Sequence, residues 1–193
     1  NDGGDTINGE NGDDLLEGEG GDDTISGGDG NDTIFGGQGK DSTSGGVGND
    51  VFRFRAGSEI SGLAETISGG ADVDTIDFSQ TFADVDLQLA TLSSVERLLL
   101  NAQTVTLTAA QLGAFSFISA SGNFERLTLS APGIVDLTGA TIIGIDDFRG
   151  TSGSDTYIFT GVTTGQTVTT LGGIDKVAGS AGNDTIDAGA GVD

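Results

Sequence analysis

The sequence predicts an all-β fold, a right-handed parallel β-roll or β-solenoid. Three observations support this prediction: a strict nine-residue repeat opens the chain, strand-like alternation of aliphatic residues fills the middle, and the repeat returns at the end. We therefore expect two repeat-built rolls, residues 1–79 and 151–193, that flank an aliphatic-core β-solenoid, residues 80–150. In the first block an aspartate recurs every nine residues without a slip, at Asp5, Asp14, Asp23, Asp32, Asp41 and Asp50.

Each nine-residue unit is expected to form one turn and one short strand. Glycine at the first, second and fourth places lets the chain adopt positive φ, and the residues around Asp-Thr-Ile form a strand with its last side chain inward. Two units close a flattened coil, so Asp14 should stack on Asp32, and Asp23 on Asp41, about 4.8 Å apart. The inward residues are Ile7, Leu16, Ile25, Ile34 and Phe52, with Thr43 as the exception.

This stacking of carboxylates has an electrostatic cost that points to a metal ion. Two carboxylates at that spacing repel by about 3.5 kcal/mol at an effective dielectric near 20. One buried Ile or Leu contributes roughly 1.5–3 kcal/mol, so the coil should not hold without a cation. Calcium prefers oxygen ligands, which carboxylates and turn carbonyls supply, whereas the absence of His and Cys disfavours zinc and other transition metals. We expect several calcium ions.

The repeats resemble the GGxGxDxUx nonapeptides of RTX proteins. The match is close in GGDGNDTIF and GGVGNDVFR, and looser where Glu10 and Glu19 replace the second glycine. The resemblance implies a secreted bacterial protein of type I secretion, with calcium held between turns two repeats apart by the sixth-place aspartates and turn carbonyls. A disordered Gly/Asp linker is the alternative. The candidate calcium ligands are Asp5, Asp14, Asp23, Asp32, Asp41, Asp50, Asp74, Asp155, Asp175, Asp184 and Asp193.

The period breaks after the first block. We expect a closing strand at residues 51–54, then a short loop or helical turn around Ser58–Glu65. The motif resumes in residues 69–79, where Asp74 takes the ligand place and Asp72 the usual glycine place. This site is therefore predicted to be irregular.

The middle of the chain shows a second, uneven periodicity. The triplets at residues 85–87, 105–107 and 135–137 are predicted to begin three coils of a wider solenoid held by aliphatic side chains, with residues 115–123 as an extra loop. A leucine-rich-repeat horseshoe is disfavoured because its fixed spacing is absent.

Three arginines are predicted to recur at matching places of these coils, Arg97, Arg126 and Arg149. One interpretation is a basic ladder that contacts an acidic ligand. The interpretation that we favour is that each arginine pairs with a nearby carboxylate, such as Glu96, Glu125 or Asp147.

The last block returns to the nonapeptide style. Asp155 takes the ligand place, with Ile158 expected inward, and Asp175, Asp184 and Asp193 follow nine residues apart. The turn before Asp175 lacks two glycines, so its calcium site is doubtful.

Composition limits the function. Thirty acidic and seven basic residues give a net charge of −23, which argues against nucleic acid or an anionic membrane as a partner. No stretch is long and apolar enough for a membrane span, no signal peptide is visible, and zero cysteine excludes disulfides. The chain has no methionine and begins and ends inside a repeat, so we expect an excerpt of a longer protein.

The residue types predict a structural function and no enzyme. Catalytic triads and thiol sites need His or Cys, and aspartates in glycine turns make a poor glycosidase pair. We expect a calcium-dependent structural segment of a large secreted bacterial protein of surface-layer or adhesin type, extracellular or on the cell surface, with self-association end to end or in a lattice. The alternatives are an accessory module of a secreted protease, lipase or epimerase, and a carbohydrate- or ice-binding module at Thr160–Thr170.

Overall fold

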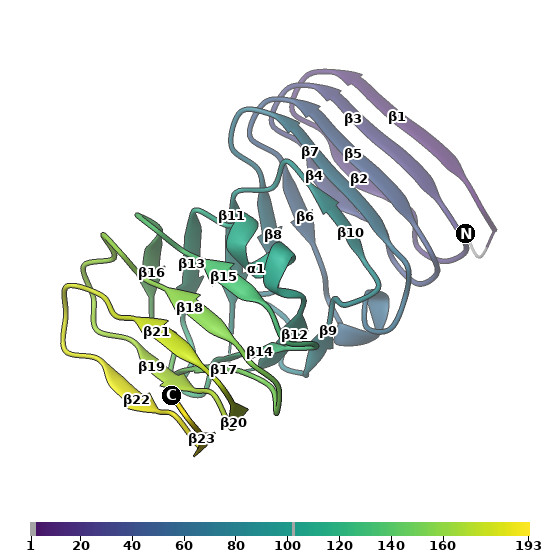
Figure 1. Cartoon of the computed structure of the whole chain (residues 1–193). Coiled ribbons are helices and arrows are strands. Elements are labelled where there is room, and N and C mark those ends of the chain that lie inside the picture. Colours follow the sequence, from purple (N-terminus) through teal and green to yellow (C-terminus); the bar gives the residue numbers. More distant parts are fainter. Residues whose placement is uncertain (1–2, 102) are drawn as a thin grey trace. The chain divides into compact units, whose positions relative to one another are not determined.

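The computed structural model describes residues 3–101 and 103–193. They form two compact units, and the boundary lies between Leu99 and Leu100. Each unit is a parallel β-solenoid (Figure 1). The three segments expected from the sequence were defined by their sequence patterns, whereas these two units are defined by the contacts within each of them. The division into three segments stays a prediction. Among the described residues, none of the helices has the length and hydropathy of a membrane span.

The first unit has two faces of parallel strands. The neighbouring strands of one face are β1 (Thr6–Asn11), β3 (Thr24–Asp29), β5 (Ser42–Val47), β7 (Thr66–Ala71) and β10 (Thr91–Ser93). Those of the other face are β2 (Leu15–Glu17), β4 (Thr33–Phe35), β6 (Val51–Arg53), β8 (Thr75–Asp77) and β11 (Arg97–Leu100). Along the chain, the 3₁₀ turn η1 (Gly57–Glu59) comes between β6 and β7, and the short strand β9 (Val85–Asp86) comes between β8 and β10.

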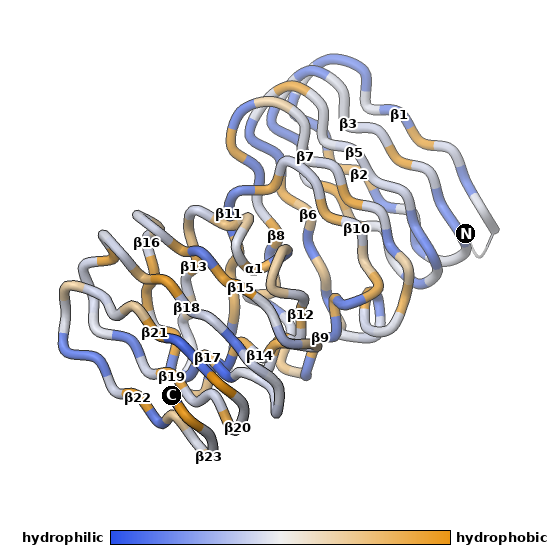
Figure 2. The backbone as a smooth tube through the Cα atoms, viewed as in Figure 1, coloured by the Kyte–Doolittle hydropathy of each residue, from blue (hydrophilic) through white to orange (hydrophobic). Residues whose placement is uncertain are grey.

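The register of these strands stacks the inward residues predicted from the repeat. Ile7 lies opposite Ile25, Ile25 opposite Thr43, and Thr43 opposite Ile67. On the other face the stack is Leu16, Ile34, Phe52 and Ile76. Figure 2 shows the result, with hydrophobic positions recurring along the strands and hydrophilic segments in the turns. The prediction that two nonapeptides form one coil around these inward residues is confirmed.

The second unit is built from strands of two to four residues. One row is β12 (Thr104–Leu107), β14 (Arg126–Leu129), β17 (Asp147–Arg149), β19 (Thr167–Thr169) and β22 (Thr185–Asp187). Another is β15 (Ile134–Asp136), β18 (Thr156–Ile158) and β21 (Lys176–Ala178), and two pairs are β13 (Phe117–Ala120) with β16 (Thr141–Ile143) and β20 (Gly172–Gly173) with β23 (Ala190–Gly191). The helix α1 (Ala109–Ala114) packs beside β15.

The core of the second unit is aromatic as well as aliphatic. The rings of Phe148 and Phe159 meet edge to face with centroids 5.1 Å apart, and Tyr157 stacks on Phe159 at 6.0 Å. Val105 and Leu127 are opposite each other and fully buried. Such burial contributes roughly 1.5–3 kcal/mol for each large side chain, so this unit has a core that does not depend on its turns.

One local prediction is wrong, and one helix was not predicted. Residues 115–123, expected as an extra loop, contain strand β13, whose Ile118 lies opposite Ile142 in β16. The helix α1 was not expected. It begins with a capping box, in which Thr108 Oγ1 accepts from Gln111 N and Gln111 Oε1 accepts from Thr108 N, and these bonds satisfy two otherwise free N–H groups.

The predicted alignment of the middle coils is also wrong. Val105 lies opposite Leu127 and not opposite Val135, which lies opposite Tyr157 in another row. Within the second unit, Arg126 lies opposite Asp147, and its Nε is 3.1 Å from the Asp147 Oδ2.

Arg149 therefore does not stack on Arg126 as a ladder would require, because its neighbour in the register is Thr128. The pairing with a nearby carboxylate is confirmed for Arg126. Next to Asp155, the inward side chain is the fully buried Tyr157, two residues on, and not the half-buried Ile158.

Candidate functional site

The aspartates of the first unit form two columns, one along each edge of the roll. In the first column Asp5 N donates to Asp23 Oδ1 (2.7 Å) and Asp23 N to Asp41 Oδ1 (2.9 Å). Asp41 N then donates to Glu65 Oε2 (2.8 Å), so the column ends on a glutamate. Each carboxylate thus accepts a hydrogen bond from a backbone N–H in the preceding coil, at the residue just before a strand.

The second column follows the same rule on the opposite edge. Asp14 N donates to Asp32 Oδ1, Asp32 N to Asp50 Oδ1 and Asp50 N to Asp74 Oδ1, each at 2.8 Å. Asp74 N donates to Glu96 Oε2 at 3.0 Å. The predicted stacking of Asp14 on Asp32, and of Asp23 on Asp41, is confirmed by these bonds.

In most members of the columns, the second carboxylate oxygen is buried and has no hydrogen-bond partner among the described residues. A buried ionised oxygen without a partner is costly, because it has lost its water and gained no donor. The atoms are Asp14 Oδ2, Asp23 Oδ2, Asp32 Oδ2, Asp41 Oδ2, Asp50 Oδ2, Glu65 Oε1 and Asp74 Oδ2.

These oxygens converge with backbone carbonyls at the first glycine of each repeat. A Cβ placed on Gly9 would lie 2.5 Å from Gly27 O, in the next turn of the edge, and 2.7 Å from Asp14 Oδ2. The same pair of oxygens surrounds the first glycine of other turns. At Gly27 the neighbours are Asp32 Oδ2 and Gly45 O. Only glycine leaves room there, and the cradle that it opens is lined by oxygen.

Burial disfavours the ionised form of the carboxylates where the roll closes. It raises the pKa of Glu65 to about 7 and that of Asp74 to about 6, although backbone N–H donors from Asp41 and Asp50 oppose the shift. Burial, and then repulsion from the preceding aspartate, also raises the pKa of Asp41 and of Asp50. A bound cation would oppose this effect and favour the ionised carboxylates.

The irregular places in the repeat keep a positive φ, although their values are lower than those of the glycines at the regular places, such as 116° at Gly28 and 136° at Gly30. Glu10 and Glu19, at the second glycine place, have φ of 72° and 71°, and Asp72, at the fourth, has φ of 79°. Leu171 has φ of 71° at the second place in the last block. The turn shape is thus set by the nine-residue register, even where a side chain must adopt the left-handed region.

Two aspartates of the second unit are satisfied by the protein itself. Asp155 Oδ2 accepts from Thr151 N (2.7 Å) and Thr151 Oγ1 (3.0 Å). Asp184 accepts from Ser180 N through Oδ2 (2.9 Å) and from Ser180 Oγ through Oδ1 (2.6 Å). In both turns a hydroxyl residue replaces the second glycine and donates to the carboxylate, which the sequence analysis did not anticipate.

Asp175 differs from these two and resembles the columns of the first unit. Its Oδ1 accepts from Asp155 N at 2.7 Å, and its Oδ2 is buried without a partner among the described residues. With Asp193, which accepts from Asp175 N at 3.2 Å, it lines a cavity of about 280 Å³ together with Ile186. The turn expected to be doubtful therefore keeps an available oxygen.

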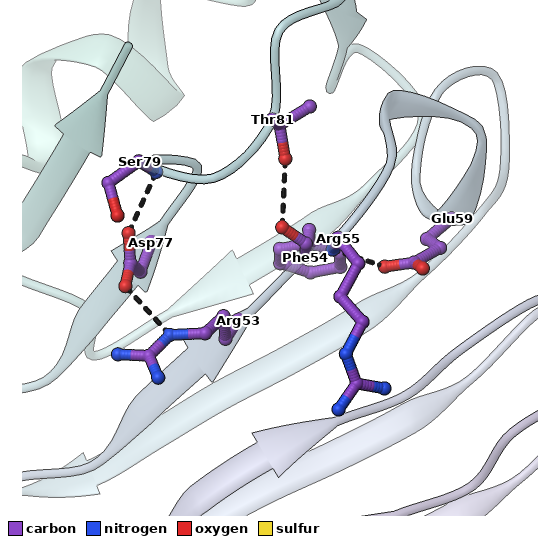
Figure 3. A network of polar contacts seen from close by, with 7 residues as sticks. All are labelled: Arg53, Phe54, Arg55, Glu59, Asp77, Ser79 and Thr81. Atoms are coloured by element: carbon purple, nitrogen blue, oxygen red, sulfur yellow. Dashed lines mark hydrogen bonds and ion pairs between the residues drawn. The ribbon is translucent and has the colours of Figure 1, made fainter.

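A polar network holds the segment between the last nonapeptide and Glu65 (Figure 3). Arg53 Nε lies 2.9 Å from Asp77 Oδ2, so it joins β6 to β8, and Thr81 Oγ1 donates to Phe54 O at 2.8 Å. Arg55 N donates to Glu59 Oε2 at the 3₁₀ turn, at 2.8 Å. This network positions the loop that replaces a regular turn.

The sequence analysis missed Glu65 and Glu96 as members of the columns. The signal for Glu65 was present, because ETISGG (residues 65–70) repeats DTISGG (residues 23–28) with one acid exchanged for another. Glu96 gives no such signal, and only its bond to Asp74 N places it in the second column.

Acidic side chains alone do not form a metal cage in this fold. Within residues 3–101 and 103–193, no three acidic, histidine or cysteine side chains gather in a way that could hold an ion. An ion in the columns would therefore also need backbone carbonyls, such as those at the glycine cradles.

Comparison with known proteins identifies the repeats. The family model of the RTX calcium-binding nonapeptide repeat, which spans four copies, matches residues 1–33, 17–52 and 161–193. No curated protein matches the chain. The matched residues include most of both columns but leave out Glu65, Asp74 and Glu96.

The residues present fit the calcium that this family implies. Calcium takes oxygen ligands, and the cradles at Gly9, Gly18, Gly27 and Gly45 each offer an unpartnered carboxylate oxygen beside a glycine carbonyl of the next turn. Asp14, Asp32 and Asp50 on one edge, with Asp23 and Asp41 on the other, would hold it. The chain therefore carries RTX calcium-binding nonapeptide repeats at residues 1–52 and 161–193.

Proposed function

We propose that the chain is a calcium-dependent structural segment of a secreted bacterial surface protein, of surface-layer or adhesin type. The observation that carries the proposal is the row of buried carboxylate oxygens, without protein partners, that face glycine carbonyls along both edges of the roll. These side chains link successive turns of the roll through hydrogen bonds to the backbone. We assign no catalytic role to them.

Charge and glycine content support folding that waits for calcium. A net charge of −23 and 35 glycines favour an expanded chain when calcium is scarce, because the aspartates repel and the backbone is free. Since a preformed site is absent from the unfolded chain, ion binding supplies folding free energy. A protein that is secreted unfolded and folds outside would use this property.

The test is a calcium titration of the chelated protein, followed by far-UV circular dichroism, with magnesium as the control. We expect a cooperative gain of β signal at roughly 0.1–1 mM calcium, the affinity class of extracellular modules, and none with magnesium. Complete β structure in chelator, with no change on adding calcium, would overturn the proposal.

A variant pair tests whether the columns carry the binding. Asp32→Asn removes a buried carboxylate of the second column and should shift the calcium midpoint upward several-fold. Asp29→Asn removes the same charge from an exposed residue three positions earlier and should leave the midpoint nearly unchanged. Equal shifts in the two variants would mean that net charge, and not the columns, governs the response.

A further inference from the structure

We propose that Glu65 and Asp41 form a calcium site that closes the first column, outside the nonapeptide repeats. Glu65 lies beyond residues 1–52, the range that the family model matches in the first unit. The proposal rests on the proposed function, since it extends calcium binding to a residue that the repeat pattern does not include.

The register places Glu65 in the position of a repeat aspartate. It directly precedes β7, just as Asp23 precedes β3 and Asp41 precedes β5. Its Oε2 accepts from Asp41 N at 2.8 Å, the bond that Asp41 Oδ1 makes with Asp23 N at 2.9 Å. The intervening turn has 24 residues instead of 18, yet the same contact forms.

The two carboxylates leave two buried oxygens without partners. Glu65 is 3% exposed and Asp41 2%, and neither Glu65 Oε1 nor Asp41 Oδ2 has a hydrogen-bond partner among the described residues. Lys40 and Asp22 also act on Glu65, and the effects of their charges oppose each other. Within the described part of the chain, no ion pair joins Lys40 to Glu65, so the buried charge calls for another cation.

The turn at Gly36 explains why a glutamate serves here. At Gly9, Gly18 and Gly27, a carbonyl of the next turn is among the nearest neighbours of the cradle. At Gly36 the three nearest atoms all belong to Asp41, because the next turn is the irregular spacer. In the proposed site, Glu65 Oε1 would take the place of that carbonyl as a ligand.

A crystal structure of the unmodified protein with calcium tests the site directly. We expect anomalous difference density for an ion bound by Glu65 Oε1 and Asp41 Oδ2. Density at Asp14, Asp32 and Asp50 with none at Glu65 would overturn this inference and leave the proposed function intact. Density at none of these aspartates would overturn both.

Ion counting in solution gives an independent readout. Glu65→Gln keeps the acceptor for Asp41 N but removes the charge, and it should bind one calcium ion fewer than the unmodified protein by equilibrium dialysis. Asp29→Asn is the matched control and should keep the full number. A folded Glu65→Gln protein with an unchanged number of ions would show that Glu65 is only a backbone acceptor. If Glu65→Gln does not fold, Glu65→Asp keeps the charge and the acceptor and restores the residue type of the repeat; it should fold and bind this ion more weakly, and an unchanged calcium affinity would count against a role for the longer side chain.

Discussion

At the residue scale, the space above the glycines decides which positions tolerate change. Gly12 and Gly28 have nearly the same φ, 118° and 116°, but their surroundings differ. A Cβ on Gly28 would collide with the backbone carbonyl of Glu10, whereas a Cβ on Gly12 would have nothing within 4 Å. Alanine substitutions at Gly12 and Gly28 therefore separate two effects on the free energy of unfolding, the effect of a positive φ and the effect of a steric clash between turns.

Gly28→Ala should therefore destabilise the protein more than Gly12→Ala. Holding alanine at this φ costs about 1–3 kcal/mol, which both variants share. Gly28→Ala must also move β3 away from Glu10, so its loss should be larger by at least about 1 kcal/mol, in the range of core overpacking. Chemical unfolding at saturating calcium measures both, and equal losses would mean that the turns are free to separate.

The hydroxyl at the second glycine place gives a second prediction at this scale. Burial raises the pKa of Asp184, but the hydrogen bonds that Ser180 donates to both of its oxygens, together with the one from Gln166 N, lower this pKa below its usual value. Ser180→Gly removes the side-chain donor and restores the nonapeptide pattern, so the variant should bind one calcium ion more than the unmodified protein. Ser152→Gly, at an exposed position in the turn before Asp155, is the control and should not change the number measured by equilibrium dialysis. A loss of stability without an added ion would contradict the prediction.

At the element scale, the sequence predicts the regular turns well because one residue type recurs at one spacing. The stacks of Ile25 on Ile7, and of Asp32 on Asp14, follow directly from the nine-residue period. Glu65 was not predicted as a member of the first column because its turn is longer than the regular ones and because the residue is glutamate instead of aspartate. In the second unit the strands lie about 21 residues apart with unequal loops, as the bond from Glu125 N to Asp146 Oδ2 shows, so no fixed period reveals that Val105 meets Leu127.

The closing turn of the roll should make the calcium-free protein sensitive to pH. Burial raises the pKa of Glu65 from 4.5 to about 7, so between these values the folded chain holds a proton that the unfolded chain has lost. The resulting stability is fully present below pH 4.5 and is lost as the pH rises through about 7. In calcium-depleted buffer, we therefore expect the first unit to be most stable at low pH and to lose its structure as the pH rises across this window.

Glu65→Gln should flatten this dependence, because glutamine does not titrate. Asp74, whose pKa is raised to about 6 by burial, should leave a residual slope below that pH. Asp29→Asn, which removes an exposed carboxylate, should keep the slope of the unmodified protein. Denaturant unfolding at several pH values measures all three, and an unchanged slope in Glu65→Gln would assign the dependence to other groups.

At the scale of the whole molecule, the two units rely on different sources of stability. The first unit buries one inward side chain per strand and carries most of the unpartnered carboxylate oxygens. The second buries Phe148, Tyr157 and Phe159 in one cluster, and Asp155 and Asp184 are satisfied by Thr151 and Ser180. Calcium removal should thus affect the units unequally.

We predict that chelation opens the first unit while much of the second remains protected. Without calcium the carboxylates of the columns repel, and the single inward residues of β1, β3 and β5 cannot offset this, so their amides should exchange quickly. The amides of β14 and β17 lie against the aromatic and aliphatic core of the second unit and should stay slow. Hydrogen exchange followed by mass spectrometry, with and without chelator, measures both in one sample, and the calcium-loaded protein is the control for intrinsic differences. Uniform loss of protection would show that the core around Phe148 is too weak alone, and that calcium stabilises both units as one cooperative structure.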